Sequence, residues 1–149
     1  MRHLFAAVSA MSLLAAVPAF AAPADPEAPV YENGPVWNFT EVKTQDGHFD
    51  DYMRWLASQW KGQEEALKKA GVITDYKILI ATDPRENEGD IMLAVQFPNM
   101  AAFDRSVADQ YALQKRIFGS LAQASREQAA RGTIRTIKSD YLMREAVLK

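Results

Sequence analysis

The stretch Val72–Phe97, VITDYKILIATDPRENEGDIMLAVQF, decides the fold of this chain. Its two ends are rich in β-branched and aromatic residues, and a polar connection with Pro and Gly lies between them at Asp83–Asp90. Strand-forming residues on both sides of turn residues are typical of a β-hairpin. The pattern therefore predicts two antiparallel strands, Val72–Thr82 and Ile91–Phe97.

A helical pattern precedes the hairpin and another follows it. The first runs from about His48 to Ala70 and ends at Gly71, a residue type that commonly terminates helices. Its apolar stripe, at a spacing of 3.6 residues, consists of Phe49, Tyr52, Met53, Leu56, Trp60 and Leu67. The second begins at Pro98 and Asn99 and continues to Arg131, with Gly119 expected to kink or end its regular part. Its stripe consists of Phe103, Val107, Tyr111, Gln114, Phe118 and Leu121.

Two further strands complete the pattern, Val36–Lys43 before the first helix and Thr133–Leu148 after the second. The resulting order is β-α-β-β-α-β. This order is that of a ferredoxin-like α+β domain, which has an antiparallel four-stranded sheet with both helices on one face.

Both faces of this predicted sheet are apolar, although two helices cover only one of them. Leu79 and Ala81 oppose Ile78 and Ile80 in the second strand, and the other strands alternate in the same way. Such a large uncovered patch is unusual for a soluble monomer. We expect a homodimer in which two sheets pack together as a barrel. In the alternative, the N-terminal tether or the C-terminal segment covers the face.

The N-terminus has the pattern of a secretory signal peptide. A short positive start at residues 1–3 precedes an apolar run, Leu4–Val17, and then Ala19-Phe20-Ala21, a small-x-small cleavage signal. Cleavage between Ala21 and Ala22 leaves 128 of the 149 residues and an expected location in a bacterial periplasm. The alternative is a retained membrane anchor. Residues 22–34 are polar and Pro-rich and read as a flexible tether before the domain at 35–149.

Composition removes several classes of function. The chain has no cysteine, so thiol chemistry and thiolate metal sites are excluded. A formal net charge of −2 offers no basic field for nucleic acid. The sequence has no second long apolar stretch, so we expect no membrane insertion after processing. His48 is the only histidine left after cleavage, which argues against a metal site, and no cofactor-binding motif is present. We expect no cofactor and no metal.

The segments PVWNFTEVKTQDGHFDDYMRWL, VITDYKILIATDP and YLMREAVLK resemble a family of short, exported bacterial proteins within the dimeric α+β barrel superfamily. The resemblance covers most of Pro35–Lys149 and implies a dimeric barrel, but it supplies no catalytic residues. The superfamily also contains cofactor-free monooxygenases and haem proteins, and fold alone transfers neither activity. Haem members of that superfamily use a histidine in the helical part after the second or third strand. Residues 100–131 contain none, which argues against a haem enzyme of that design.

Glu41 and His48 are the candidate catalytic residues. Trp37, Phe39 and Glu41 share one strand face by alternation. If this face lines the barrel, burial would raise the pKa of Glu41 and make it a proton carrier. We favour the alternative, in which Trp37 and Phe39 pack under the helices and Glu41 lies at the rim. His48 is either a general base near a cavity mouth or, as we favour, a solvated residue in the first helical turn.

Aromatic and basic residues supply the candidate ligand-binding positions, which are Trp37, Phe39, Tyr52, Arg54, Trp55 and Tyr76. Trp55 lies off the apolar stripe and is expected to be a dimer contact or a lid over a pocket. Arg54 is placed to hold an anionic ligand, or to pair with Asp51 three residues earlier on a solvated helix face.

Four polar residues interrupt the otherwise apolar strands. A polar side chain on a buried face must find a partner, so any of the four that points inward becomes a binding-site candidate. These residues are Lys77, Gln96, Arg135 and Arg144.

Two hypotheses follow for the function. In the first, a dimeric barrel binds a small, mostly apolar or aromatic molecule between its sheet and helices, with or without a cofactor-free monooxygenase-like or isomerase-like activity. In the second, the chain is a non-catalytic dimeric envelope protein whose barrel is only an interface. The sequence does not decide whether the chain is an enzyme.

Overall fold

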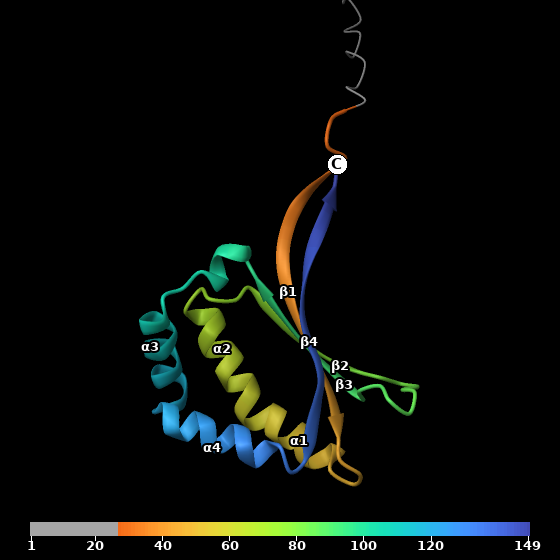
Figure 1. Ribbon diagram of the computed structural model, residues 1–149, viewed down its shortest axis with the longest axis vertical. Helices are drawn as coiled ribbons and strands as arrows, with labels where there is room; N and C mark the ends of the chain where they lie inside the picture. The colour runs from red at the N-terminus through yellow and green to blue at the C-terminus, as the bar shows by residue number, and fades with distance from the viewer. Residues whose placement is uncertain (1–26) are drawn as a thin grey trace, which may run out of the picture.

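A four-stranded antiparallel sheet is the centre of the computed structural model, which describes residues 27–149 (Figure 1). The strands lie in the order β2-β3-β1-β4, and every neighbouring pair is antiparallel, as predicted for the central hairpin. Their bounds are β1 (Tyr31–Thr44), β2 (Asp75–Ile80), β3 (Ile91–Phe97) and β4 (Arg135–Leu148). The expected signal peptide, its cleavage site and residues 22–26 of the expected tether lie outside the described residues.

The helix before the hairpin is continuous and matches its expected bounds to within one residue at each end. It consists of α1 (Phe49–Trp55), a single π-helical turn η1 (Leu56–Trp60) and α2 (Lys61–Lys69). Gly71 follows it with a φ of +68°, a conformation that glycine adopts without strain. The predicted apolar stripe packs on the sheet in a core cluster of Val42, Tyr52, Leu56, Trp60, Ile91 and Leu93.

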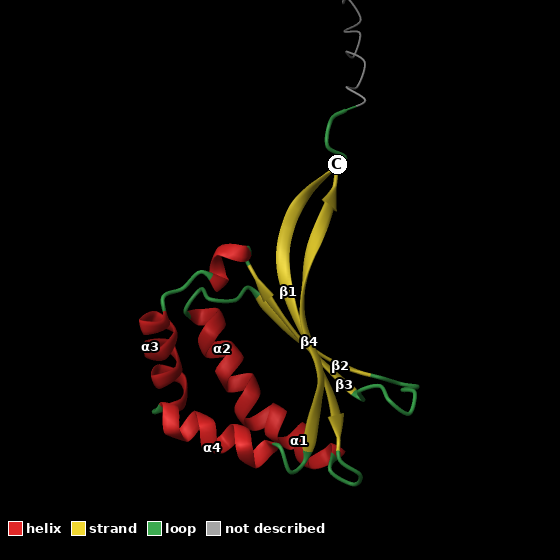
Figure 2. Ribbon diagram, in the orientation of Figure 1, coloured by secondary structure: helices red, strands yellow, loops and turns green. Residues whose placement is uncertain are grey.

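The segment after the hairpin forms two α-helices instead of the single second helix expected. A 3₁₀ turn, η2 (Met100–Phe103), precedes α3 (Val107–Phe118) and α4 (Leu121–Arg131). Gly119 has a φ of +76° and ends α3, and the Ser120 hydroxyl begins α4 by accepting a hydrogen bond from the backbone N–H of Gln123. The described chain is therefore an α+β fold with three helices, all on one side of the sheet (Figure 2).

The first strand is longer than expected because residues 31–34, assigned to the tether, belong to β1. Residues 31–33 pair with the end of β4, with Tyr31 opposite Leu148 and Asn33 opposite Ala146. Pro35 has no backbone N–H, and the pairing shifts register between Asn33 and Val36. Gly34-Pro35 thus marks an irregularity within a long strand rather than a boundary. The paired ends extend beyond the rest of the sheet as a two-stranded ribbon (Figure 1).

No helix within residues 27–149 has both the length and the apolar character that crossing a bilayer requires.

Candidate functional site

The sheet face that points away from the helices is mostly apolar, with a few polar residues among its apolar ones. Directly paired residues share a face, and Phe39 pairs with Ala94 on one side and Tyr141 on the other. Val42 and Ile91 belong to the opposite face, in the core under the helices. We call the outward set the second face: Trp37, Phe39, Leu79, Met92, Ala94, Tyr141 and Met143.

An aromatic row crosses the second face from β1 to β4. The rings of Trp37 and Phe39 stack with centroids 6.1 Å apart, and those of Phe39 and Tyr141 with centroids 5.7 Å apart. The ammonium group of Lys77 lies 5.0 Å from the centroid of the Trp37 ring. Trp37 and Phe39 are therefore half-buried on the face opposite the helices, and our favoured interpretation that they pack under the helices is wrong.

Glu41 lies on the same side of the sheet, near the β2–β3 loop, and its carboxylate is held by two donors. The backbone N–H of Gly89 donates to Oε1 at 2.6 Å, and the Ser139 hydroxyl donates to Oε2 at 2.9 Å. These hydrogen bonds favour the charged form and lower the pKa of Glu41. A raised pKa was expected only for a Glu41 buried inside a barrel, and in the single chain the two hydrogen bonds outweigh the effect of burial. The arrangement fastens the loop to β1 and keeps Glu41 ionised.

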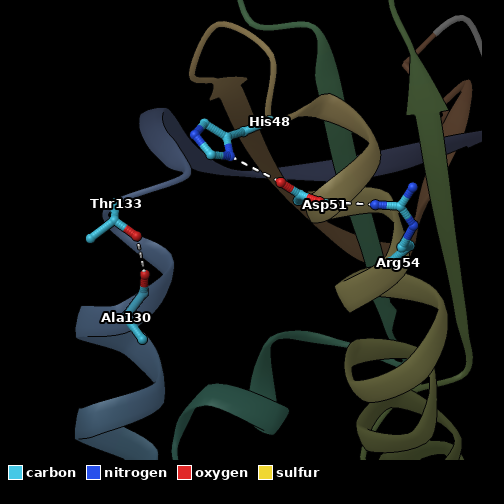
Figure 3. A network of polar contacts seen from close by, with 5 residues as sticks. All are labelled: His48, Asp51, Arg54, Ala130 and Thr133. Carbon is cyan, nitrogen blue, oxygen red and sulfur yellow. Dashed lines mark hydrogen bonds and ion pairs between the residues drawn. The ribbon is translucent and has the colours of Figure 1, made fainter.

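His48 belongs to a separate polar network at the start of α1 (Figure 3). Its Nδ1 lies 3.0 Å from Oδ2 of Asp51, and Nη1 of Arg54 donates to the other oxygen of Asp51 at 2.9 Å. The side chains are exposed, that of Arg54 by 74%. The predicted Asp51–Arg54 pair is confirmed. This pair engages Arg54, the candidate residue for binding an anion, on a solvated helix face.

Tyr76 lies on the helix side of the sheet and is also engaged. Its ring packs edge-on against Trp60 with centroids 5.3 Å apart, and its hydroxyl donates to Oε1 of Glu65 at 2.6 Å. This hydrogen bond is the main cause that raises the pKa of Tyr76 to about 12. The neighbouring Glu64 is buried, and burial raises its pKa to about 7. Glu64 follows Trp60 by four residues, so both lie on the same face of the helix. Our sequence analysis did not use this spacing to predict that Glu64 is buried.

Tyr52 and Trp55, the two remaining ligand candidates, stack on each other with ring centroids 5.6 Å apart. Two guanidinium groups lie over this pair. The central carbon of Arg131, at the end of α4, is 4.3 Å from the centroid of Trp55, and that of Arg135, at the start of β4, is 5.6 Å from the centroid of Tyr52. We call these four residues the arginine cluster.

The arginine cluster contains unsatisfied hydrogen-bond donors. Nε and Nη1 of Arg131 and Nε of Arg135 are buried without a hydrogen-bond partner in the described part of the chain. Burial, and then the nearby charge of Arg135, lower the pKa of Arg131. Arg135 is only 8% exposed, so the sequence criterion of an inward-pointing polar residue selects it as a binding-site candidate. Arg131 was not singled out, because it ends a helix that reads as solvated.

A groove of about 440 Å³ runs along α3 and α4 and reaches the arginine cluster. Arg131 belongs both to the cluster and to the lining of the groove. The other lining residues are mostly apolar or uncharged: Tyr111, Gln114, Phe118, Leu121, Ala124, Ser125 and Gln128. The groove therefore combines an uncharged wall with the Arg131 guanidinium group at one end, and Arg135 lies beside it in the arginine cluster without lining the groove.

Comparison with known proteins gives a likeness of fold. No protein-family model and no curated protein sequence matches the chain. The chain is similar to the crystal structure of HapK from Hahella chejuensis, with a TM-score of 0.51 over 74% of this chain and 91% of HapK. The sequence identity is 10%, so the similarity supports an α+β fold and transfers no activity.

Proposed function

We propose that two copies of this chain pack through their second faces as a dimeric α+β barrel, each copy being a ferredoxin-like domain. The strand order β2-β3-β1-β4 with antiparallel pairing is compatible with that topology. Leu79 and Met143 on the second face are 50% and 54% exposed, and apolar patches of this kind mark interaction surfaces. An isologous dimer buries the same patch of both copies.

The dimer is tested by replacing exposed residues of the second face. The double variant Leu79→Glu/Met143→Glu places charges in the proposed interface, where they would be desolvated without partners. Native mass spectrometry should show a dimer for the wild type and a monomer for the double variant. Val107→Glu changes an exposed residue of α3 outside the second face and should remain a dimer. A wild-type protein that is monomeric at about 100 μM, well above ordinary dimer dissociation constants, contradicts the proposal.

Each copy, we propose further, binds a small, mostly apolar or aromatic molecule in the groove along α3 and α4. The observation that carries this proposal is the groove itself, since its volume of about 440 Å³ is within the range of small-molecule sites. Aromatic and aliphatic side chains such as Tyr111, Phe118 and Leu121 supply its apolar contacts. The observations support binding and assign no reaction, because Glu41 and His48 are held in two separate polar networks.

Binding is tested by isothermal titration with two naphthalene probes, the anionic 2-naphthoate and the neutral 2-naphthamide. Ala124→Trp fills the groove and should abolish binding of both probes. Ala112→Trp adds the same ring to α3 at a separate hollow and should leave binding unchanged. If neither probe binds the wild type up to about 1 mM, binding in the groove is refuted. A dimer without such binding would favour the second hypothesis, an envelope protein whose barrel is only an interface.

The location of the protein is a third part of the proposal. The positive start, apolar run and small-x-small signal of residues 1–21 support export to a periplasm. Mass spectrometry of the protein from an envelope fraction should find an N-terminus at Ala22. A chain that retains Met1 in that fraction would contradict cleavage and support a retained anchor.

A further inference from the structure

We propose that the molecule bound in the groove carries an oxyanion group, which Arg131 and Arg135 bind at the end of the groove. This inference rests on the proposed binding function and names the chemical class of its ligand, an apolar or aromatic carboxylate, sulfonate or phosphate. It is carried by the paired guanidinium groups of the arginine cluster and by their unused donors.

Three donors of the arginine cluster have no hydrogen-bond partner in the described part of the chain. A guanidinium group has five N–H donors, and an unpaired buried donor costs free energy. Arg131 donates from Nη2 to Oε1 of Gln128 at 3.0 Å, which leaves its Nε and Nη1 without partners in the described chain. Nε of Arg135 is also unpaired. Arginine stays charged in proteins, so these positive charges need an external partner.

The acidic residues near the cluster do not supply that partner. Neither arginine forms an ion pair with any residue of the described part of the chain. Glu127, the acid with the main electrostatic effect on Arg131, accepts a hydrogen bond from the side-chain amide of Gln123 at 3.0 Å. Two like charges therefore lie beside each other with no carboxylate bound to either, as expected of a site prepared for an anion.

The aromatic rings make the cluster suited to a planar oxyanion. A guanidinium group that lies over Trp55 or Tyr52 keeps its N–H groups in its own plane, where they can form a bidentate contact with a carboxylate. Turning the end of the Arg131 side chain, which lines the groove, would bring Nε and Nη1 to a ligand there. The Tyr111, Phe118 and Leu121 side chains of the groove then pack against the body of the same molecule.

The test compares 2-naphthoate with 2-naphthamide, which have the same ring system and differ in the charge of one substituent. The wild-type protein should bind the carboxylate about tenfold or more tightly than the amide, because charge-assisted hydrogen bonds are the stronger ones. Arg131→Gln should remove this preference, and Arg135→Gln should reduce it. Arg126→Gln is the matched control, since Arg126 is an exposed residue of α4 outside the groove lining.

The outcomes separate this inference from the binding function on which it rests. If both probes bind equally, and Arg131→Gln and Arg131→Lys leave both affinities unchanged, the oxyanion inference is overturned while binding in the groove stands. If neither probe binds, the binding function itself fails. Circular dichroism of each variant confirms that it is folded. If Arg135→Gln does not fold, the result for Arg131→Gln alone decides the oxyanion inference. Arg131 is half-buried and is the last residue of α4, so we expect this variant to fold.

Discussion

The guanidinium carbon of Arg131 lies 4.3 Å from the centroid of the Trp55 ring, and this contact joins the end of α4 to the end of α1. A cation–π contact of this kind contributes about 0.5–2 kcal/mol to stability. Arg135 lies over the neighbouring Tyr52 ring, so two positive charges share one aromatic pair. Their repulsion and the buried donors without partners oppose the aromatic contact. The cluster is therefore expected to favour ligand binding at the expense of stability.

Replacing Arg131 by Met tests this balance. Arg131→Met keeps an unbranched apolar stem over Trp55 and removes one of the two charges. Loss of the cation–π contact is offset by removal of unpaired donors, which cost about 1–3 kcal/mol. We expect the free energy of unfolding without ligand to stay within about 1 kcal/mol of wild type or to rise. Urea denaturation measures it, and a loss of more than about 2 kcal/mol would show that Arg131 is mainly a structural residue.

Glu64 predicts a pH dependence of stability. Its carboxyl is buried, its Oε2 has no hydrogen-bond partner in the described chain, and its pKa is raised from 4.5 to about 7. The folded state then holds this proton more tightly than the unfolded state does. Stability from this group is fully present below pH 4.5, falls as the pH rises to about 7, and is constant above that. The loss is at most about 3.5 kcal/mol, because the pKa rises from 4.5 to about 7 and each pKa unit corresponds to about 1.4 kcal/mol.

The measurement is the free energy of unfolding of wild type and Glu64→Gln at several values between pH 5 and 8. Gln cannot ionise, so the variant should show a smaller decrease and be more stable than wild type at pH 8. Glu65→Gln is the neighbouring control, and because Glu65 is exposed it should keep the slope of the wild type. Parallel curves for Glu64→Gln and wild type would mean that Glu64 reaches water when the protein is folded.

Local periodicity was enough to predict the hairpin and the first helix. The alternation of side chains in β2 and β3 also predicts a sheet with two apolar faces. Tyr52, Leu56 and Trp60 follow one helical stripe, and all three are buried in the core. These features depend on residues close together in the sequence, so a sequence pattern can report them.

Features that depend on distant pairing could not be predicted from such patterns. Gly34-Pro35 was interpreted as the boundary between tether and domain. Residues 31–33 belong to the strand because they pair with the end of β4, and no local sequence pattern shows that pairing. Arg131, and the meeting of the four residues of the arginine cluster, were missed for the same reason. Arg131 and Arg135 are four positions apart but belong to a helix and a strand, and only the fold places both over Tyr52 and Trp55.

Glu41 predicts the opposite pH dependence to that of Glu64. Its pKa is lowered from 4.5, chiefly by the Gly89 N–H and then by the Ser139 hydroxyl. Stability from this group is present above about pH 4.5 and is lost as the pH falls through the lower pKa of the folded state. Glu41→Gln should therefore lower the free energy of unfolding at pH 7 by about 1 kcal/mol, typical of one hydrogen bond.

The difference between Glu41→Gln and wild type should shrink as the pH is lowered below 4.5, because the wild-type carboxyl then becomes neutral as well. Glu86→Gln, a change at an exposed residue of the same loop, should match wild type at every pH. A Glu41→Gln protein as stable as wild type at pH 7 would contradict a role for this carboxylate in fastening the loop.

Gly89 and Gly62 predict opposite results for the same substitution. A Cβ atom at Gly89 would lie 2.6 Å from the carbonyl oxygen of Val42 and 2.6 Å from Cγ of Glu41, so the loop would have to move away from β1. Gly89→Ala should cost roughly 2 kcal/mol, within the range for overpacked sites. A Cβ at Gly62, inside α2, meets nothing within 4 Å, and Gly62→Ala should add up to about 1 kcal/mol through helix propensity. Thermal denaturation of the two variants checks both signs, and a neutral Gly89→Ala would show that the loop is not held closely against β1.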